Sequence, residues 1–258
     1  MELVYGQLMD TLMALWWPFV RVLALLALTP AIGDGLVPMP VRVLLALVLS
    51  VVLLPAAPAV PIEPFSAAAL AATVEQAVIG GAIGIALQLT VAVMLLLGNL
   101  ISGQIALSMA LMNDPINGTS SDVVSAFLNI LGILLFFALD GHLLVVTILA
   151  GSFKAFPIGQ GFGDLSLLGL AHNVAWVFSA ALALSLPVMF ATAVVQIGFG
   201  FLNRVAPTMN LFALGFSVVT VFGIFMLTFL VRAVPEHYIR MTQRVLEMIH
   251  HGLRVPHG

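Results

Sequence analysis

Long apolar runs without a single charged side chain dominate the pattern along the chain. A stretch near the N-terminus, residues 11–33, is similar except for one internal cation, Arg21. About 20 apolar residues in a helix span the ~30 Å hydrocarbon core of a bilayer. The pattern therefore predicts an all-α fold with about six long hydrophobic helical segments, some of them broken. The charge-free runs are 43–62, 76–113, 123–139, 165–203 and 205–231.

Two runs are too long for one ordinary membrane span. Runs 76–113 and 165–203 hold 38 and 39 residues, and 39 residues in a helix would measure about 58 Å. Either these runs break or their helices extend beyond the apolar slab. Pro187 favours a break, because it removes a backbone donor. Glycines and amides inside run 76–113 are typical of helix–helix contacts, so we expect much of the surface to face protein.

The C-terminal segment, residues 232–258, has a different pattern. Apolar and polar positions alternate at helical spacing after Pro235, which predicts an amphipathic helix rather than a span. Four of the 8 Lys and Arg residues lie beyond Val231, which predicts a cytoplasmic C-terminus. The apolar positions are Tyr238, Met241, Val245, Ile249 and Leu253.

The composition limits the class of protein. Charged residues make up 7% of the 258 residues, apolar residues 62%, and the mean hydropathy is +1.21. An ordinary soluble domain carries about 25% charged residues. The composition therefore excludes a cytosolic enzyme, and the net charge of −3 argues against nucleic-acid binding. Without cysteine, a disulfide framework or thiol nucleophile is excluded.

Candidate chemistry is sparse. No catalytic or metal-ligand motif is present, so we expect no enzyme activity, no cofactor and no metal. Arg21 is interpreted either as a gate or ion-path residue or as a structural arginine bonded to carbonyls or an acidic neighbour. Asp140 and His142 flank Gly141 and could form a proton relay or a simple helix–helix turn. These three polar residues leave open an alternative function, proton-coupled transport of a small solute.

Residues 106–115 form the most suggestive connector. Met109 and Met112 lead into Asn113, Asp114 and Pro115. Methionine is unbranched and adaptable, which suits a seal that must later reshape. The alternative is an ordinary helix end with two packed methionines.

Three stretches of this sequence resemble one known family in order and spacing. The first runs from Arg21 through Thr29-Pro30 and Val37-Pro38 to Pro55, and the second from Asp140-Gly-His142 to Pro157-Ile-Gly159. The third, from Gly200 to Phe216 (GFLNRVAPTMNLFALGF), is the most specific. Together they resemble the FliR/SpaR-like family of type III secretion export-gate proteins. Thr208, Ser217 and Asp140 depart from residues usual in that family.

The resemblance implies one export-gate domain over residues 1–258. It comprises FliP-like helices over 1–164, a FliQ-like helical hairpin over 165–231, and the amphipathic C-terminal helix over 232–258. The implied function is that of a structural and gating subunit in the bacterial inner membrane, at the flagellar basal body. It would help nucleate a pore complex with FliP-like and FliQ-like subunits, with an FlhB-like protein as a further partner. A related virulence injectisome remains open.

The resemblance also implies two sets of functional residues. A plug loop over about 107–117 would block the pore until unfolded export substrates displace it. The hairpin tip would contact neighbouring subunits. The plug residues are Leu107, Met109, Leu111, Met112, Asn113, Asp114 and Pro115, and the tip residues are Asn203, Arg204, Pro207 and Asn210.

Overall fold

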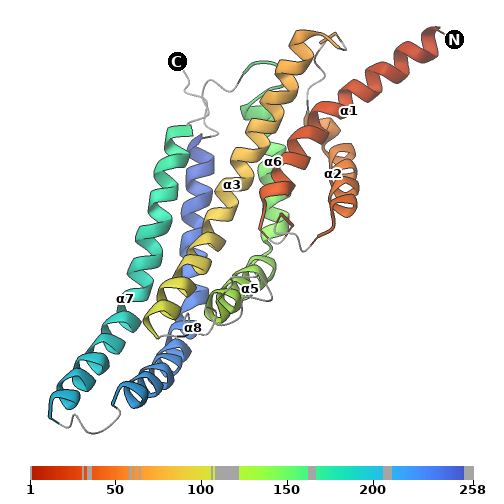
Figure 1. Ribbon diagram of the computed structural model, residues 1–258. Helices are drawn as coiled ribbons and strands as arrows, with labels where there is room; N and C mark the ends of the chain where they lie inside the picture. Colours follow the sequence, from red (N-terminus) through yellow and green to blue (C-terminus); the bar gives the residue numbers. More distant parts are fainter. Residues whose placement is uncertain are drawn as a thin grey trace. The chain divides into compact units, whose positions relative to one another are not determined.

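In the computed structural model, every regular element among the described residues is a helix (Figure 1). The structure describes residues 2–30, 32–33, 37–57, 60, 62–63, 65–105, 107, 122–161, 167–205 and 211–252. The helices are α1 (Glu2–Leu28), α2 (Met39–Leu53), the short 3-10 helix η1 (Leu54–Ala56), α3 (Ala67–Gln104), α5 (Val123–Ala138), α6 (Gly141–Ala155), α7 (Leu167–Val205) and α8 (Leu211–Gly252). This confirms the predicted all-α class.

Five helical stretches among the described residues are long and apolar enough to cross a membrane. The bent pair α5 and α6 adds a sixth if it forms one span. The prediction of about six long hydrophobic segments is therefore confirmed. The five stretches are Thr11–Leu28, Met39–Ala56, Ala67–Gln104, Ala171–Val205 and Leu214–Ile249.

The longest helices do not break where the sequence favoured a break. α3 is one helix of 38 residues, and α7 is one helix of 39 residues with Pro187 inside it. α8 likewise continues through Pro235 as one helix of 42 residues, so the amphipathic stretch is its last part rather than a separate helix. A single proline removes one backbone donor and can bend a helix without ending it. These helices therefore do not break but extend beyond the thickness of a bilayer core.

Two compact units are distinguished within the chain, and α3 contributes to both. The first comprises residues 1–89, 136–172 and 243–258. In it, α1 crosses the first part of α3 at two glycines. A Cβ at Gly80 would lie 2.1 Å from the carbonyl oxygen of Arg21, and one at Gly84 would lie 2.7 Å from that of Leu25. The small residues thus bring the two backbones together.

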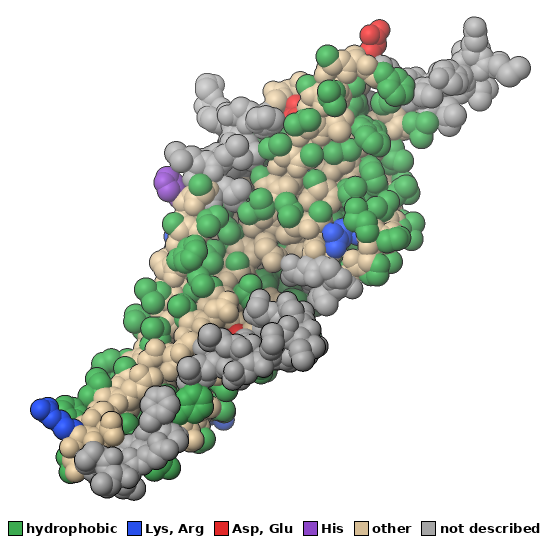
Figure 2. Space-filling model, in the orientation of Figure 1, with side chains coloured by type: hydrophobic (Ala, Val, Ile, Leu, Met, Phe, Trp, Pro, Cys, Tyr) green, Lys and Arg blue, Asp and Glu red, His purple; other side chains and the backbone are tan. Residues whose placement is uncertain are grey.

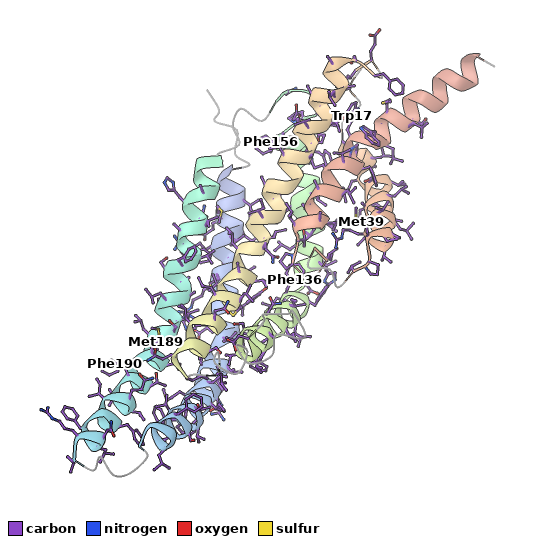
Figure 3. The ribbon with its side chains drawn as sticks, viewed as in Figure 1. Trp17, Met39, Phe136, Phe156, Met189 and Phe190 are labelled. Atoms are coloured by element: carbon purple, nitrogen blue, oxygen red, sulfur yellow. The ribbon has the colours of Figure 1, made fainter. Side chains whose placement is uncertain are left out.

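An apolar cluster lies beside the contact between α1 and α3. Trp17 of α1 packs with Ala69 and Ala72 of α3 and with Ile158, which follows α6. Figure 3 labels Trp17 beside the first turns of α3. Burial of these side chains holds the turn after α6 against α1 and α3.

The second unit comprises residues 90–135 and 173–242. α7 and α8 run side by side within it as a hairpin (Figure 1). α5 approaches the end of α3 closely, since a Cβ at Gly98 would lie 2.4 Å from Cα of Ser125. The end of α3 is thereby in contact with the start of α5.

Candidate functional site

Arg21 is a fully buried cation in the second half of α1. Its Nε donates a hydrogen bond to Oε1 of Gln76 at 2.7 Å. The two terminal nitrogens donate to Oγ of Ser152 at 3.1 Å and to the carbonyl oxygen of Phe156 at 2.8 Å. The guanidinium carbon also lies 4.2 Å from the ring centroid of Phe153. One side chain therefore joins α1 to α3, to α6 and to the turn that follows α6.

Glu75 supplies the negative charge of the same network. Nε2 of Gln76 donates to Oε1 of Glu75 at 2.9 Å, so Gln76 bridges the cation and the carboxylate. The backbone N–H groups of Gly159 and Gly161 donate to the two carboxylate oxygens at 3.1 Å and 2.9 Å. Both glycines have positive φ, +79° and +82°, a conformation that costs glycine little. These residues are called the Arg21–Glu75 network below.

The Arg21–Glu75 network has the properties of a buried polar network that holds helices together. A charge taken out of water is costly unless it is paired and hydrogen-bonded. Arg21 engages Nε and both of its terminal nitrogens with oxygen atoms, and Glu75 engages both of its oxygens. This arrangement supports the structural interpretation of Arg21 over an ion path.

Asp140 and His142 lie at the turn between α5 and α6. Asp140 has a left-handed backbone, with φ of 55°, and precedes the first residue of α6. Both side chains are exposed. His142 lies beside the ring of Phe137, with 6.0 Å between ring centroids. Within the described ranges no hydrogen bond joins Asp140 to His142, so the geometry supports the turn rather than the proton relay.

The two segments that the resemblance singled out lie mostly outside the described residues. Leu107 is described and half-buried. Asn203 and Arg204 are exposed at the end of α7. Outside the described residues lie Met109, Leu111, Met112, Asn113, Asp114, Pro115, Pro207 and Asn210. The roles of both segments remain predictions.

Apolar side chains cover much of the visible surface, with few charged groups among them (Figure 2). α7 and α8 contribute most clearly. Within an 18-residue apolar segment of each helix, 28% of the residues of α7 and 17% of those of α8 are buried, whereas the figure for α3 is 72%. Phe190, 74% exposed, projects from α7 (Figure 3). Such continuous apolar faces mark contact with protein or lipid.

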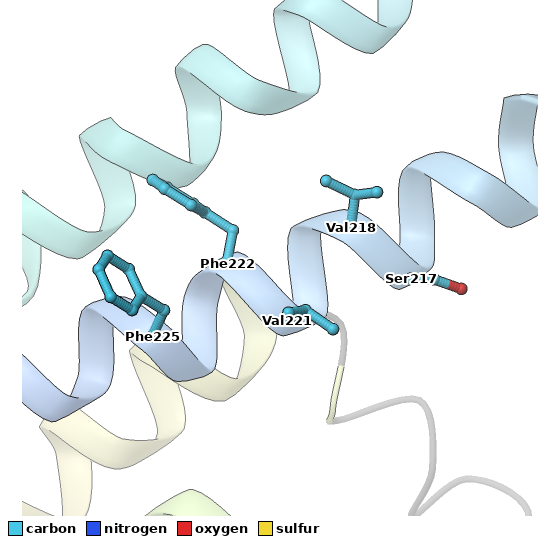
Figure 4. Close-up of a pocket in the computed structure, with 5 residues that line it drawn as sticks. All are labelled: Ser217, Val218, Val221, Phe222 and Phe225. Atoms are coloured by element: carbon cyan, nitrogen blue, oxygen red, sulfur yellow. The ribbon is translucent and has the colours of Figure 1, made fainter.

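A hollow on α8 forms part of this surface (Figure 4). Its lining is apolar apart from one serine. In Figure 4, Phe222 points from α8 toward α7. The hollow is a feature of the hairpin's apolar face and shows no group suited to catalysis. Its lining residues are Ser217, Val218, Val221, Phe222 and Phe225.

The sequence contains one signal that marks Glu75. Glu75 is the one acidic residue between Glu63 and Asp114, at the edge of a 38-residue charge-free run. A carboxylate in such apolar surroundings requires a partner. Its partners, two backbone N–H groups more than 80 residues away in sequence, could not be identified from the pattern.

The chain matches known proteins over most of its length. Residues 12–245 match the family described as "Bacterial export proteins, family 1". The flagellar biosynthetic protein FliR of Pectobacterium carotovorum subsp. carotovorum is 33% identical over 235 residues, covering 91% of this chain and 90% of that protein. FliR of Escherichia coli (strain K12) is 32% identical over 210 residues, covering 81% and 80%.

A relative with a different name extends the family. The surface presentation of antigens protein SpaR of Salmonella typhimurium is 27% identical over 183 residues, covering 69% of this chain and 68% of that protein. A family match over nearly the whole chain, together with FliR relatives above 30% identity, confirms the resemblance drawn from the sequence motifs. The chain belongs to the FliR/SpaR family of bacterial export proteins.

Proposed function

We propose that this chain is a structural and gating subunit of the flagellar type III protein export gate in the bacterial inner membrane. It helps nucleate a pore complex with FliP-like and FliQ-like subunits, and contacts an FlhB-like protein. It plugs the pore until unfolded export substrates pass. The names and coverage of the FliR relatives support the flagellar assignment over an injectisome.

The length of the exposed apolar face on α7 carries this proposal. Large apolar side chains are exposed from Val174 to Val205, about 47 Å along a helix axis at 1.5 Å per residue. Lipid chains cover only about 30 Å. A lipid bilayer alone therefore leaves part of this face in contact with water, whereas neighbouring subunits can cover all of it.

Apolar plugging is a suitable mechanism for such a pore. A narrow apolar constriction blocks ions by dewetting. The plug residues from Leu107 to Pro115 include two methionines, which adapt to new neighbours without breaking strong polar bonds. An unfolded polypeptide can then displace the seal. Four basic residues beyond Val231 support a cytoplasmic C-terminus.

Deletion of Ser108–Asn117 in the full gate tests the plug. We expect the deletion to raise ion leakage across the inner membrane while the complex still assembles. The same deletion in cells that lack the FliP-like subunit is the control, because leakage through the gate requires the gate. Unchanged conductance in an intact complex would refute the plug.

A further inference from the structure

The carboxyl end of α3 is held by side chains from both arms of the α7–α8 hairpin. Nε2 of Gln196, on α7, donates a hydrogen bond to the carbonyl oxygen of Gln104 at 3.1 Å. Oγ1 of Thr220, on α8, lies 3.0 Å from the carbonyl oxygen of Ile105 and 3.0 Å from that of Phe216 in its own helix, so its one hydrogen is shared between them. Two consecutive carbonyls at the end of α3 thus find partners on two different helices.

These carbonyls are the groups that a helix leaves without partners. The last four C=O groups of an α-helix have no intrahelical donor, and in apolar surroundings such groups must be satisfied by other means. The carbonyl of Ile101 accepts from the N–H of Ile105 at 3.0 Å. Within the described part of the chain, the carbonyls of Gln104 and Ile105 accept from side chains of the hairpin.

An apolar contact reinforces the two hydrogen bonds. Ile105 is fully buried, and Gly223 on α8 leaves the space that its side chain occupies. A Cβ at position 223 would lie 2.1 Å from Cγ2 of Ile105. Thr220 and Gly223 are three residues apart on one helix face, so α8 contacts both the backbone and the side chain of Ile105.

The start of α5 is attached differently. Oγ of Ser125 lies 2.9 Å from Oδ1 of Asn99 on α3, and 3.2 Å from Oδ2 of Asp122. Oδ1 of Asp122 accepts from the N–H of Val124 at 3.2 Å. The start of α5 is therefore attached to α3 through Ser125, whereas residue 105 contacts the hairpin.

We propose that Gln196 and Thr220 are positioning residues that fix the start of the plug segment, Leu107, through the end of α3. The hairpin carries the apolar faces that neighbouring subunits cover. Assembly of those subunits around the hairpin therefore also fixes the position of Leu107, where the plug segment starts. This inference rests on the proposed plug role of residues 107–117. It assigns to the hairpin a contact with residues 104 and 105, directly before the plug segment.

The test combines a structural and a functional measurement in the assembled gate. Because the chain has no cysteine, Leu107→Cys provides a single site for a thiol-reactive maleimide. The double variant Gln196→Glu with Thr220→Val removes both donors at nearly constant side-chain size. We expect the rate of maleimide labelling to rise about tenfold and ion leakage to increase.

Three further variants make the result specific. Thr220→Ser, which keeps the hydroxyl, should leave maleimide labelling at Leu107→Cys slow. Thr228→Val on the same helix removes only a hydroxyl that donates to Phe225 within α8, and should change neither measurement. Cysteines at Ile105 and Gly223 would have Cβ atoms 2.8 Å apart, so α8 must move away slightly for them to reach the distance of about 3.5–4.5 Å that a disulfide takes. Oxidising this pair should return the leakage of the double variant to the parental level.

The outcomes separate this inference from the proposed function. Leakage in the Ser108–Asn117 deletion but unchanged labelling and leakage in the double variant would overturn the positioning role alone. Faster labelling without leakage in either variant would support the hairpin contact and overturn the plug role on which this inference rests.

Discussion

Gly80 of α3 lies directly against the carbonyl oxygen of Arg21 in α1, where a Cβ at position 80 would come within 2.1 Å. Gln76, which accepts a hydrogen bond from Arg21, precedes Gly80 by four residues and shares its helix face. Gly80 thus lets the α1 backbone approach α3, and Gln76, one turn earlier in α3, accepts the hydrogen bond from the Arg21 side chain. The close approach and the buried network depend on one another.

The first prediction concerns this approach. Gly80→Ala should destabilise the protein by about 1–3 kcal/mol, because the methyl group meets backbone atoms that cannot move without shifting α1. Gly81→Ala is the matched control, since a Cβ there meets only Cδ1 of Leu28 at 3.5 Å. Thermal unfolding of the purified complex in mild detergent measures both. Equal melting temperatures for the two variants would contradict the packing described for Gly80.

The second prediction concerns Glu75. Glu75→Gln should cost about 1–3 kcal/mol, because an amide NH₂ replaces one of the oxygens that accept from Gly159 and Gly161. The exposed Glu63 provides the control Glu63→Gln. The turn at 157–161 should become more sensitive to protease in the first variant only. If both variants resist protease and heat alike, Glu75 does not hold this turn.

The third prediction concerns the hairpin tip. Replacing Arg204 and Asn210 by alanine should weaken retention of neighbouring subunits or of the FlhB-like protein during purification. Arg240→Ala is the control, because Arg240 is exposed and pairs with Glu236 within α8, and such surface pairs contribute about 0–1 kcal/mol. Co-purification and motility are measured for each. Full retention of all partners and normal motility in the tip variant would argue against a contact role.

The class of fold could be predicted because charge is so scarce. A segment that carries no charge over 20 or more residues is expected to form a membrane-spanning helix. The apolar runs therefore located the segments of α2, α3, α5, α7 and α8. Their continuity could not be predicted. The glycines of run 76–113 indicated helix–helix contacts, and Gly80 and Gly84 do contact α1, but the pattern could not identify α1 as their partner. Pro187 favoured a break and the pattern after Pro235 predicted a separate amphipathic helix, yet α7 and α8 continue through these prolines.

The partners of Arg21 lay beyond the reach of the sequence pattern. Its isolation in an apolar run indicated a buried cation that needs a partner. Gln76, Ser152 and Phe156 are 55, 131 and 135 residues away. No periodicity connects such positions, because only the tertiary fold brings them together. The FliR-like motifs, by contrast, could be identified directly, since order and spacing along the chain define them.

Isolation of the tagged chain from membranes in mild detergent, followed by mass spectrometry, tests most directly whether it works as a subunit of a larger gate. We predict that FliP-like and FliQ-like proteins co-purify with it as a stable complex. Recovery of a solitary monomer that by itself moves a small solute across reconstituted vesicles would contradict the account.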